Sequence, residues 1–238
     1  MALILNIETA TKICSVSLSL NGKNIISKEY NGEDFSHSKL LTVFIEELFS
    51  ESDFEMSNLQ AISVSKGPGS YTGLRIGVST AKGIAYALEI PLISVNTLLA
   101  MTWGLNRNLS NYYNISSNKE ILFCPMLDAR RMEVYTSIYN SSLDIIQETN
   151  ALIVDSTSFN DLLLTNTIIF FGDGAEKCKN IISNDNAVFI DNFFPSANFM
   201  AKLSEESFTM NRFENVAYFE PFYLKDFMAT VPKKNIYG

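Results

Sequence analysis

The sequence is poor in the residues that build metal centres and nucleophilic sites. Its 238 residues include a single histidine, His37, and no HxxxH pair, CxxC pair or cluster of carboxylates at ligand spacing. These absences argue against a zinc or iron site. A Ser–His–acid hydrolase would need His37 as its base, but a lone histidine on the apolar stripe of a helix is more often a packing or capping residue.

Disulfide spacing and long apolar runs are missing as well. Cys14, Cys124 and Cys178 cannot all pair with one another, and each lies in or beside an apolar segment, which is typical of buried, reduced thiols. No apolar run approaches the ~20 residues of a membrane helix, and Met1 leads into a short strand rather than a signal sequence. We expect a cytoplasmic protein with no membrane contact.

Positive charge is also in short supply. Lys and Arg number 18 against 26 Asp and Glu, which gives a formal net charge of −8. A chain this acidic repels a phosphate backbone, so we expect no broad surface for direct nucleic-acid binding. The basic pairs Arg130–Arg131 and Lys233–Lys234 are short and fit solvated charge at a turn and at a tail.

What the sequence does contain is a succession of short strands, tight turns and helices. We predict strands at residues 3–7, 13–20, 25–30, 59–65 and 91–95, and helices at residues 37–48 and 74–88. Asn21-Gly22 is a strong hairpin signal between the second and third strands. Because a strand, a turn, a helix and a strand follow one another from residue 59 onward, the two strands of this βαβ unit should be parallel.

The opening pattern returns in the second half of the chain. A strand at 121–127 leads into Asp128, as the first strand leads into Glu8. We predict further strands at 133–139, 143–149 and 167–171, and helices at 156–164 and 197–208. A duplicated unit accounts for the repeat, so we predict two domains, residues 1–105 and 106–238, with the polar stretch 106–119 as the crossover.

Residues 67–73, Gly-Pro-Gly-Ser-Tyr-Thr-Gly, form a glycine-rich turn that leads into a predicted helix. The turn lacks the Lys and Ser or Thr of a P-loop and the glycine spacing of a dinucleotide-binding fingerprint. Two interpretations remain: a tight turn whose Ser70 or Thr72 caps the helix, or an anion site made of backbone N–H groups. The candidate residues for nucleotide or anion contact are Gly67, Gly69, Ser70, Thr72 and Arg75.

The helix after this turn carries little side-chain bulk at Gly73, Gly77, Thr80, Ala81 and Gly83. Glycine inside a helix costs about 1 kcal/mol relative to alanine, so something should offset that cost. Either the helix packs closely on its own sheet, or a helix of another subunit docks there. Docking predicts that Gly77→Leu abolishes pairing and leaves the fold mostly intact, which is the outcome we expect. Internal packing predicts that the same change unfolds the chain.

The acids that end two strands resemble those that face magnesium and phosphates in kinases and ATPases. Neither Glu8 nor Asp128 is followed by the glycine that lets a backbone approach a phosphate closely, since Asp128 leads into Ala129-Arg130-Arg131. This argues against a working phosphate-binding turn. Gly172-Asp-Gly174 fits either a turn or the remnant of a nucleotide-contacting loop.

Five segments in the same order resemble the TsaB family. Residues 65–85, SKGPGSYTGLRIGVSTAKGIA, are similar to the family signature GPGSFTGLRIG and the helix that follows it. The other four segments are residues 4–18, similar to ILAIDTSTxxxSVAL; 126–135, similar to xxDARxxEVY; 171–174, a glycine turn; and 220–225, similar to PxYLR. Glu8 stands where the family usually has aspartate.

The resemblance implies a fold and the loss of a metal site. The expected fold is α/β, of the actin, sugar-kinase and heat-shock ATPase (ASKHA) type, with two duplicated ribonuclease-H-like domains in which helices flank mixed sheets. The catalytic relative TsaD carries a metal-binding HxxxH where this chain has Thr97 and Met101. We therefore expect no metal and no cofactor of the chain's own, with ATP or ADP bound only at the interface of a complex.

The resemblance also implies a role and partners. A non-catalytic subunit of this family pairs with TsaD, which transfers threonylcarbamoyl to the tRNA adenosine 3′ of the anticodon; the ATPase TsaE joins, and tRNA is met only through the complex. The same face forms a homodimer when TsaD is absent. The expected interface residues are Leu40, Leu41, Phe44, Leu48, Gly73, Gly77, Thr80 and Ala81. The alternative is a stand-alone ASKHA-type ATPase, a phosphotransferase or a peptidase.

Overall fold

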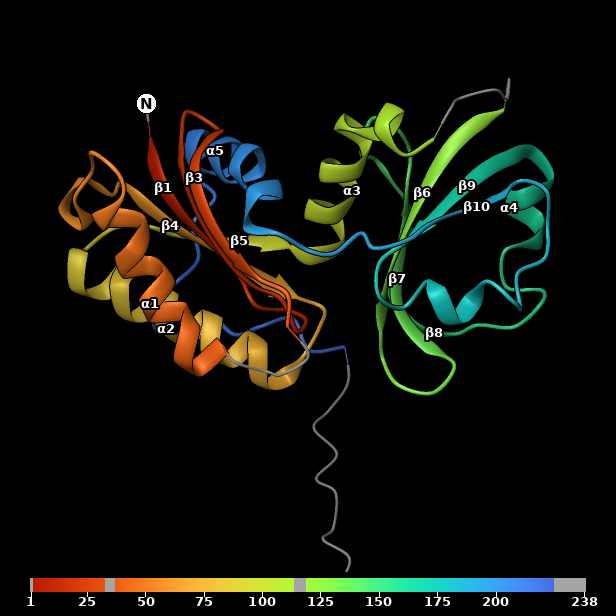
Figure 1. Cartoon of the computed structure of the whole chain (residues 1–238), viewed down its shortest axis with the longest axis horizontal. Helices are drawn as coiled ribbons and strands as arrows, with labels where there is room; N and C mark the ends of the chain where they lie inside the picture. The colour runs from red at the N-terminus through yellow and green to blue at the C-terminus, as the bar shows by residue number, and fades with distance from the viewer. Residues whose placement is uncertain (1, 33–36, 114–118, 225–238) are drawn as a thin grey trace, which may run out of the picture.

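The chain folds into two five-stranded mixed sheets with helices on their faces (Figure 1). The computed structural model describes residues 2–32, 37–113 and 119–224. The first sheet has the order β3-β2-β1-β4-β5 and the second the order β10-β9-β6-β7-β8. The elements of the first half are β1 (Leu3–Glu8), β2 (Cys14–Leu20), β3 (Lys23–Tyr30), α1 (His37–Ser50), β4 (Ala61–Gly67), α2 (Tyr71–Leu88), β5 (Leu92–Asn96) and α3 (Thr97–Arg107). Those of the second half are β6 (Glu120–Asp128), β7 (Glu133–Tyr139), β8 (Ile145–Ile153), α4 (Asn160–Thr165), β9 (Asn166–Phe171), β10 (Ala187–Ile190) and α5 (Ala201–Thr209).

The first sheet confirms the predicted hairpin and the predicted βαβ unit. Strand β2 is antiparallel to both β1 and β3, and β4 runs parallel to both β1 and β5. The turn between β2 and β3 places Asn21 at φ 54° and Gly22 at φ 71°, the left-handed conformation for which Asn-Gly is selected.

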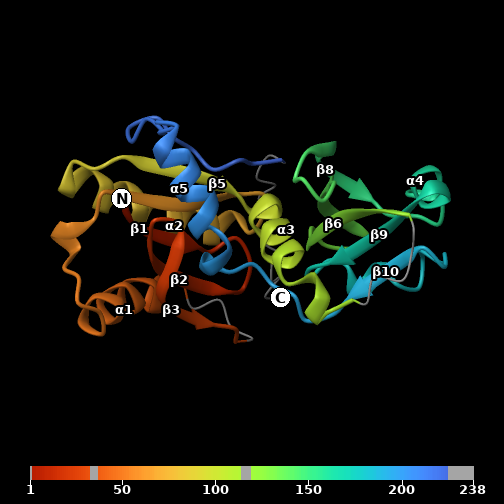
Figure 2. The same ribbon diagram turned by 90° about the horizontal axis from the view of Figure 1, so that it is seen from above.

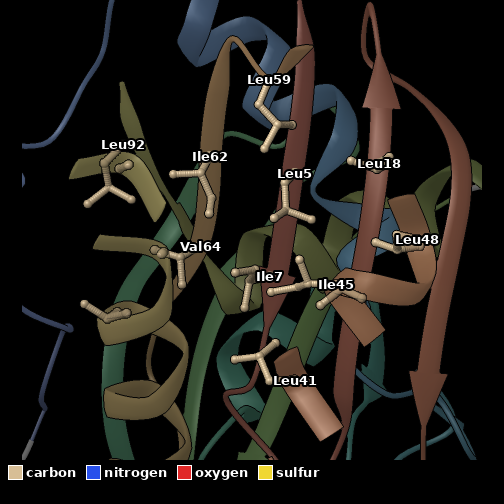
Figure 3. Close-up of a cluster of buried hydrophobic side chains, with 14 of the residues drawn as sticks. Leu5, Ile7, Leu18, Leu41, Ile45, Leu48, Leu59, Ile62, Val64 and Leu92 are labelled. Atoms are coloured by element: carbon tan, nitrogen blue, oxygen red, sulfur yellow. The ribbon is translucent and has the colours of Figure 1, made fainter. Parts of the chain in front are cut away.

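Strand β1 is buried on both faces, and its alternating side chains separate two layers of the core. Leu5 and Ile7 point to the layer made with α1 and α2, where they meet Leu41, Ile45 and Val64 (Figure 3). Ala2 and Ile4 point to the opposite layer, which also contains Ile93 and Met200. A strand enclosed in this way is continuously apolar, as the sequence of β1 predicts.

Helix α5 corrects one part of the predicted division of the chain. Residues 201–209 were expected in the second unit, but they pack on the first sheet, opposite α1 and α2 (Figure 1). A buried hydroxyl fixes the helix there: Ser204 Oγ bonds Asn6 Oδ1 at 2.7 Å and Ser63 Oγ at 2.8 Å. The chain then runs along the edge of the sheet, where Glu214 N donates to Leu92 O at 2.8 Å. The predicted boundary between residues 105 and 106 was placed from the repeat alone, and the repeat does not show that the chain returns to the first sheet.

Helix α3 lies between the two sheets in both views (Figures 1 and 2). Leu98, Met101 and Leu105 pack against the second sheet, whereas Ala100 belongs to the layer under the first sheet. The sequence prediction placed no helix here. The N-cap of α3 is Asn96, whose Oδ1 accepts from Leu99 N at 3.1 Å.

The second sheet repeats the strand order of the first, as the duplicated pattern predicted. Strand β8 begins after residue 143 because Leu143 adopts φ 68° in the preceding turn. Helix α4 begins later than predicted because Asp155 accepts from Thr157 N at 2.8 Å and holds the chain in a turn. Strand β10, which has four residues, was not predicted. The crossover 106–119 is described only in part, and residues 225–238, including Lys233–Lys234, lie outside the described residues.

The three cysteines are free and buried, as predicted. Burial raises the pKa of Cys14 and of Cys124 to about 12, so neither thiol is a ready nucleophile. No helix in the described ranges is long and apolar enough to cross a membrane.

Candidate functional site

The glycine-rich turn before α2 is packed tightly against the turn that follows β1. Ser70 N donates to Ala10 O at 2.6 Å, and a Cβ added at Gly69 would lie 2.2 Å from the same oxygen. Ser70 is also the N-cap of α2, because its Oγ accepts from Gly73 N at 3.2 Å. Two backbone donors that an anion would need are therefore already paired, and the geometry supports the capped turn.

The other candidate anion contacts do not converge on this turn. Gly67 adopts φ +103°, a conformation suited to glycine, and its Cβ position is closed by Leu74 and the Phe222 carbonyl. Thr72 is exposed on the helix. Arg75 lies over the Tyr71 ring, 4.2 Å from its centroid, and its hydrogen bond with Tyr223 raises the arginine pKa. Arg75 thus holds Tyr223 against the start of α2.

The small residues predicted to dock a partner mostly face the chain itself, which corrects the expected interface. A Cβ at Gly73 would lie 2.1 Å from Thr9 O, and one at Gly77 would lie 2.2 Å from Thr9 Oγ1. Ala81 is buried in the core layer that α1 and α2 form with the first sheet. Only glycine fits at position 77, because the turn after β1 approaches α2 closely there. Gly77→Leu should therefore damage the fold rather than pairing alone.

Helix α1 divides in the same way. Leu41 and Leu48 are buried in the core between α1 and the sheet. Leu40 and Phe44 pack against that core with part of each side chain exposed, and on α2 Thr80 is also partly exposed. Of the predicted interface residues, only these three present surface to a partner.

The outer face of the α1–α2 pair carries a different set of residues, which the sequence interpretation did not select as a face. Ser79, Gly83 and Ala87 are exposed and spaced four apart, so they share one side of α2. A Cβ at Gly83 would meet no described atom within 4 Å. Tyr86 on α2 is 81% exposed and Val43 on α1 is 43% exposed. The sequence does contain this pattern: small residues recur every four positions at Ser79, Gly83 and Ala87, on a different face of α2 from Gly73 and Gly77.

At the end of β1, Glu8 is wholly buried. Its Oε1 accepts from Ala10 N at 2.6 Å, and its Oε2 has no hydrogen-bond partner among the described residues. Burial raises the pKa of this carboxyl to about 7, against hydrogen bonds from Ala10 and Ser65 that lower it. A carboxyl so placed is held largely protonated at mildly acid pH.

The position at which the resemblance places metal ligands does not fit a metal. Thr97 and Ser65 are joined by a 2.6 Å hydrogen bond between their hydroxyls, and both are buried. Met101 packs in the apolar cluster with Phe123 and Phe171. No group of three or more His, Cys, Asp and Glu residues in the described ranges is arranged to hold an ion. A hydroxyl pair and a packed thioether do not replace two imidazoles.

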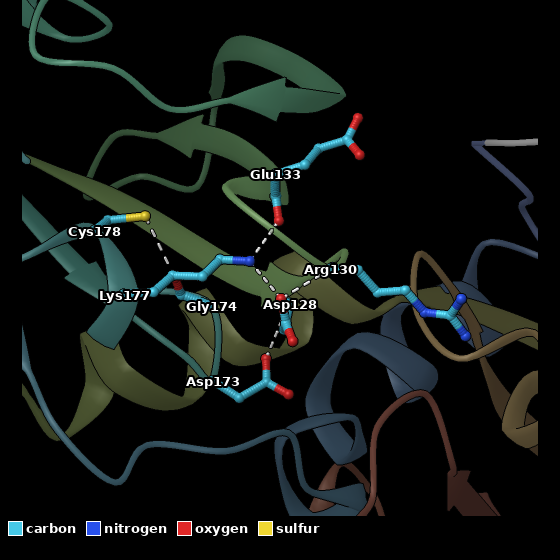
Figure 4. A network of polar contacts seen from close by, with 7 residues as sticks. All are labelled: Asp128, Arg130, Glu133, Asp173, Gly174, Lys177 and Cys178. Atoms are coloured by element: carbon cyan, nitrogen blue, oxygen red, sulfur yellow. Dashed lines mark hydrogen bonds and ion pairs between the residues drawn. The ribbon is translucent and has the colours of Figure 1, made fainter.

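Asp128, the counterpart of Glu8, is held in a polar network at the end of β6 (Figure 4). Lys177 Nζ forms an ion pair with Asp128 Oδ1 and donates to Glu133 O at 2.7 Å. Arg130 N donates to the same Oδ1 at 3.0 Å, and Asp128 N donates to Asp173 Oδ1 at 3.0 Å. The ammonium of Lys177 is thus paired with the carboxylate that would face a magnesium ion in a phosphotransferase.

The turns beside Asp128 are shaped by close backbone approach. A Cβ at Gly172, which has φ +105°, would lie 2.2 Å from Met126 O, so the segment 172–174 is a turn packed on β6. Burial raises the pKa of Asp173. Arg130 and Arg131 adopt φ 71° and 52° in the turn from β6 to β7, and Figure 4 shows the Arg130 guanidinium directed away from Asp128.

Comparison with known proteins assigns the family. A protein-family model described as "TsaD: tRNA N6-adenosine threonylcarbamoyltransferase" matches residues 34–233. The "tRNA threonylcarbamoyladenosine biosynthesis protein TsaB" of Escherichia coli strain K12 is 27% identical over 232 residues, which cover 95% of this chain and 96% of that protein. The protein of the same name from Bacillus subtilis strain 168 is 31% identical over 156 residues, 64% of this chain and 63% of that protein.

A solved structure supports the fold independently. It is described as an uncharacterized protein from Pseudomonas aeruginosa with similarity to peptidase YEAZ, and it superposes with a TM-score of 0.79 over 94% of this chain and 100% of that chain, at 21% identity. The duplicated order of an antiparallel three-strand unit continued by parallel strands is that of the ASKHA fold. The chain therefore belongs to the tRNA N6-adenosine threonylcarbamoyltransferase family and, within it, to the TsaB proteins of threonylcarbamoyladenosine biosynthesis.

Proposed function

We propose that this chain is a non-catalytic scaffold subunit that binds a TsaD-type catalytic subunit and supports transfer of threonylcarbamoyl to the tRNA adenosine 3′ of the anticodon. The observation that carries the proposal is the outer face of α1 and α2, where Ser79, Gly83 and Ala87 leave a bare strip on α2 and the side chains of Tyr86 and Val43 are exposed. Small residues let a partner helix approach closely, and exposed aromatic side chains supply anchors at an interface. The relatives' names support the pathway.

The proposal includes the other members of the assembly. A TsaE-type ATPase joins the pair, and ATP or ADP binds only at an interface of the complex. The chain meets tRNA through the complex rather than directly, which its net charge of −8 supports. In the absence of a TsaD-type partner, the same α1–α2 face forms a homodimer.

Co-purification with the TsaD-type chain of the same organism tests this function. Gly83→Leu and Tyr86→Ser should each weaken binding at least about tenfold, because one fills the strip and the other removes an anchor. Leu164→Ser is the matched control, since Leu164 is a 73% exposed apolar side chain on α4. Binding that is unchanged by both α2 variants, with the fold intact, would place the interface elsewhere.

The lone chain provides a second test of the same proposal. A non-catalytic subunit should hydrolyse ATP far below ordinary enzyme rates of ~1 per second, and the TsaD-type chain should supply the activity of the pair. Turnover near that rate by the lone chain, lost on Asp128→Asn, would favour the alternative of a stand-alone ATPase.

A further inference from the structure

A hollow of about 410 Å³ lies at the edge of the first sheet, away from the α1–α2 face. Its walls are the end of β4 and the outer edge of β5, one side of α5, and residues 210–214 of the returning chain. The carboxyl ends of parallel strands are where α/β sheets commonly bind ligands, and β4 and β5 are parallel neighbours. The volume falls within the range of ~300–1,000 Å³ typical of small-molecule sites.

The acidic side chains of this hollow already have partners. Glu214 Oε1 accepts from Ser94 Oγ at 2.5 Å, while the Glu214 backbone is tied to the edge of β5. Glu206 forms an ion pair with Lys202, one turn earlier on α5, at 3.4 Å. Lys202 offsets the charge of Glu206, whereas the hydroxyl of Ser94 fixes the position of the Glu214 carboxylate without offsetting its charge.

The basic side chains of the hollow lack such partners. Lys66 and Arg212 both line it, and neither forms an ion pair with another residue of the described ranges. Lys66 belongs to β4 and Arg212 to the segment after α5, so two elements far apart in sequence bring the cations to one cavity. An arginine fork and a lysine ammonium together suit an oxyanion.

The remaining wall is apolar. Leu99, Leu203 and Phe213 line the hollow, and the Phe213 ring packs on the Phe208 ring with centroids 5.8 Å apart. A ligand that fills this space therefore has a compact apolar or aromatic body beside its charged group. We propose that the hollow binds a small organic oxyanion, a carboxylate or a phosphate monoester, whose charge is held by Lys66 and Arg212.

Titration calorimetry on the full chain tests this site with four probes: inorganic phosphate, AMP, adenosine and benzoate. Binding of AMP or benzoate supports the proposal, and comparing the two tells phosphate from carboxylate. AMP should bind more tightly than adenosine, because the charged group is the anchor. Phosphate alone should bind more weakly than the better of the two organic anions, because it leaves the apolar wall empty.

Variants identify the residues. Lys66→Gln and Arg212→Gln should each weaken the tightest probe at least about tenfold, the scale of a lost charge-assisted hydrogen bond. Lys23→Gln is the matched control, since it removes the same charge from exposed β3 at the opposite edge of the same sheet. Absence of binding by all probes overturns the proposal. So does binding that both substitutions leave unchanged in variants with wild-type melting temperature, or measurable binding of AMP and adenosine with equal affinity.

Discussion

Gly77 and Gly83 lie on the same helix and have opposite surroundings. The Cβ position of Gly77 is closed by Thr9, whereas that of Gly83 is open. The sequence shows that α2 is rich in small residues, but it cannot tell which face meets the chain's own β1, because that approach depends on residues about seventy positions away. The docking interpretation therefore selected the buried face.

We predict that Gly77→Leu destabilises the chain by about 3 kcal/mol or more, because even a methyl group would overlap Thr9 and break the hydrogen bond from Thr9 Oγ1 to Gly73 O. Gly83→Leu should raise the free energy of unfolding by up to about 1 kcal/mol, because the site is open and leucine has the better helix propensity. Urea unfolding of both variants compares them. Equal stability of the two would mean that α2 does not approach β1 as described.

Glu8 should make stability depend on pH. Burial raises its pKa from 4.5 to about 7, so the folded state binds the proton more tightly than the unfolded state does. Stability is therefore highest at low pH in this window and falls as the pH rises from about 4.5 to about 7, by about 3 kcal/mol in all. Above pH 7 the contribution is constant.

Glu8→Gln is the control for this effect, because the amide keeps an acceptor for Ala10 N and does not titrate. The free energy of unfolding of the variant minus that of the wild type should increase between pH 5 and pH 8. Measuring both proteins in urea at the two pH values removes the contribution of other titrating groups. A difference that stays constant with pH would show that Glu8 is not held protonated.

At the scale of elements, local signals and long-range packing account for different parts of the structure. Asn21-Gly22 fixes its hairpin, and the βαβ unit follows from residues close in sequence. Helix α3 was not predicted, although Asn96 is a good N-cap. The position of α5 depends on hydrogen bonds to Asn6 and Ser63, which no local pattern contains.

We predict that Ser204→Ala weakens the attachment of α5 and costs about 1–3 kcal/mol of stability, because Asn6 Oδ1 and Ser63 Oγ stay buried after losing a partner. Ser207→Ala on the same helix is the control, since no hydrogen bond joins its hydroxyl to another described residue and the change in helix propensity is the same. Thermal or urea unfolding compares the two. Similar losses would mean that the hydroxyl of Ser204 has no special role.

At the scale of the whole molecule, the chain leaves the first sheet after α3, builds the second sheet, and returns to the first. The repeated acid-ended strands revealed the duplication, since β1–β2–β3 and β6–β7–β8 share a pattern that a single sequence displays. The return could not be predicted in the same way, because residues 197–222 contact the first sheet without repeating any of its features. How the chain divides into folding units stays a prediction. Because α5 packs on the first sheet, we expect residues 1–105 to depend on the rest of the chain.

A fragment of residues 1–105 should fail to fold on its own, although it contains the whole first sheet. Removing α5 exposes Ala2, Ile4 and Ile93 and leaves buried Asn6 and Ser63 without the Ser204 hydroxyl. Cutting within α3 also exposes Leu98 and Met101, which pack on the second sheet. The fragment therefore loses apolar burial on two surfaces at once, and each buried Ile, Leu or Met side chain is worth about 1.5–3 kcal/mol.

Co-expression with residues 106–238 provides the matched comparison, because that fragment carries α5 and the second sheet. We expect fragment 1–105 alone to show no cooperative unfolding transition in near-ultraviolet circular dichroism, and the two fragments together to form a complex that does. A cooperative transition of the lone fragment close to that of the full chain would mean that residues 1–105 are an independent domain. In that case α5 would be a dispensable cover, and the polar contacts of Ser204 would add little to the first sheet.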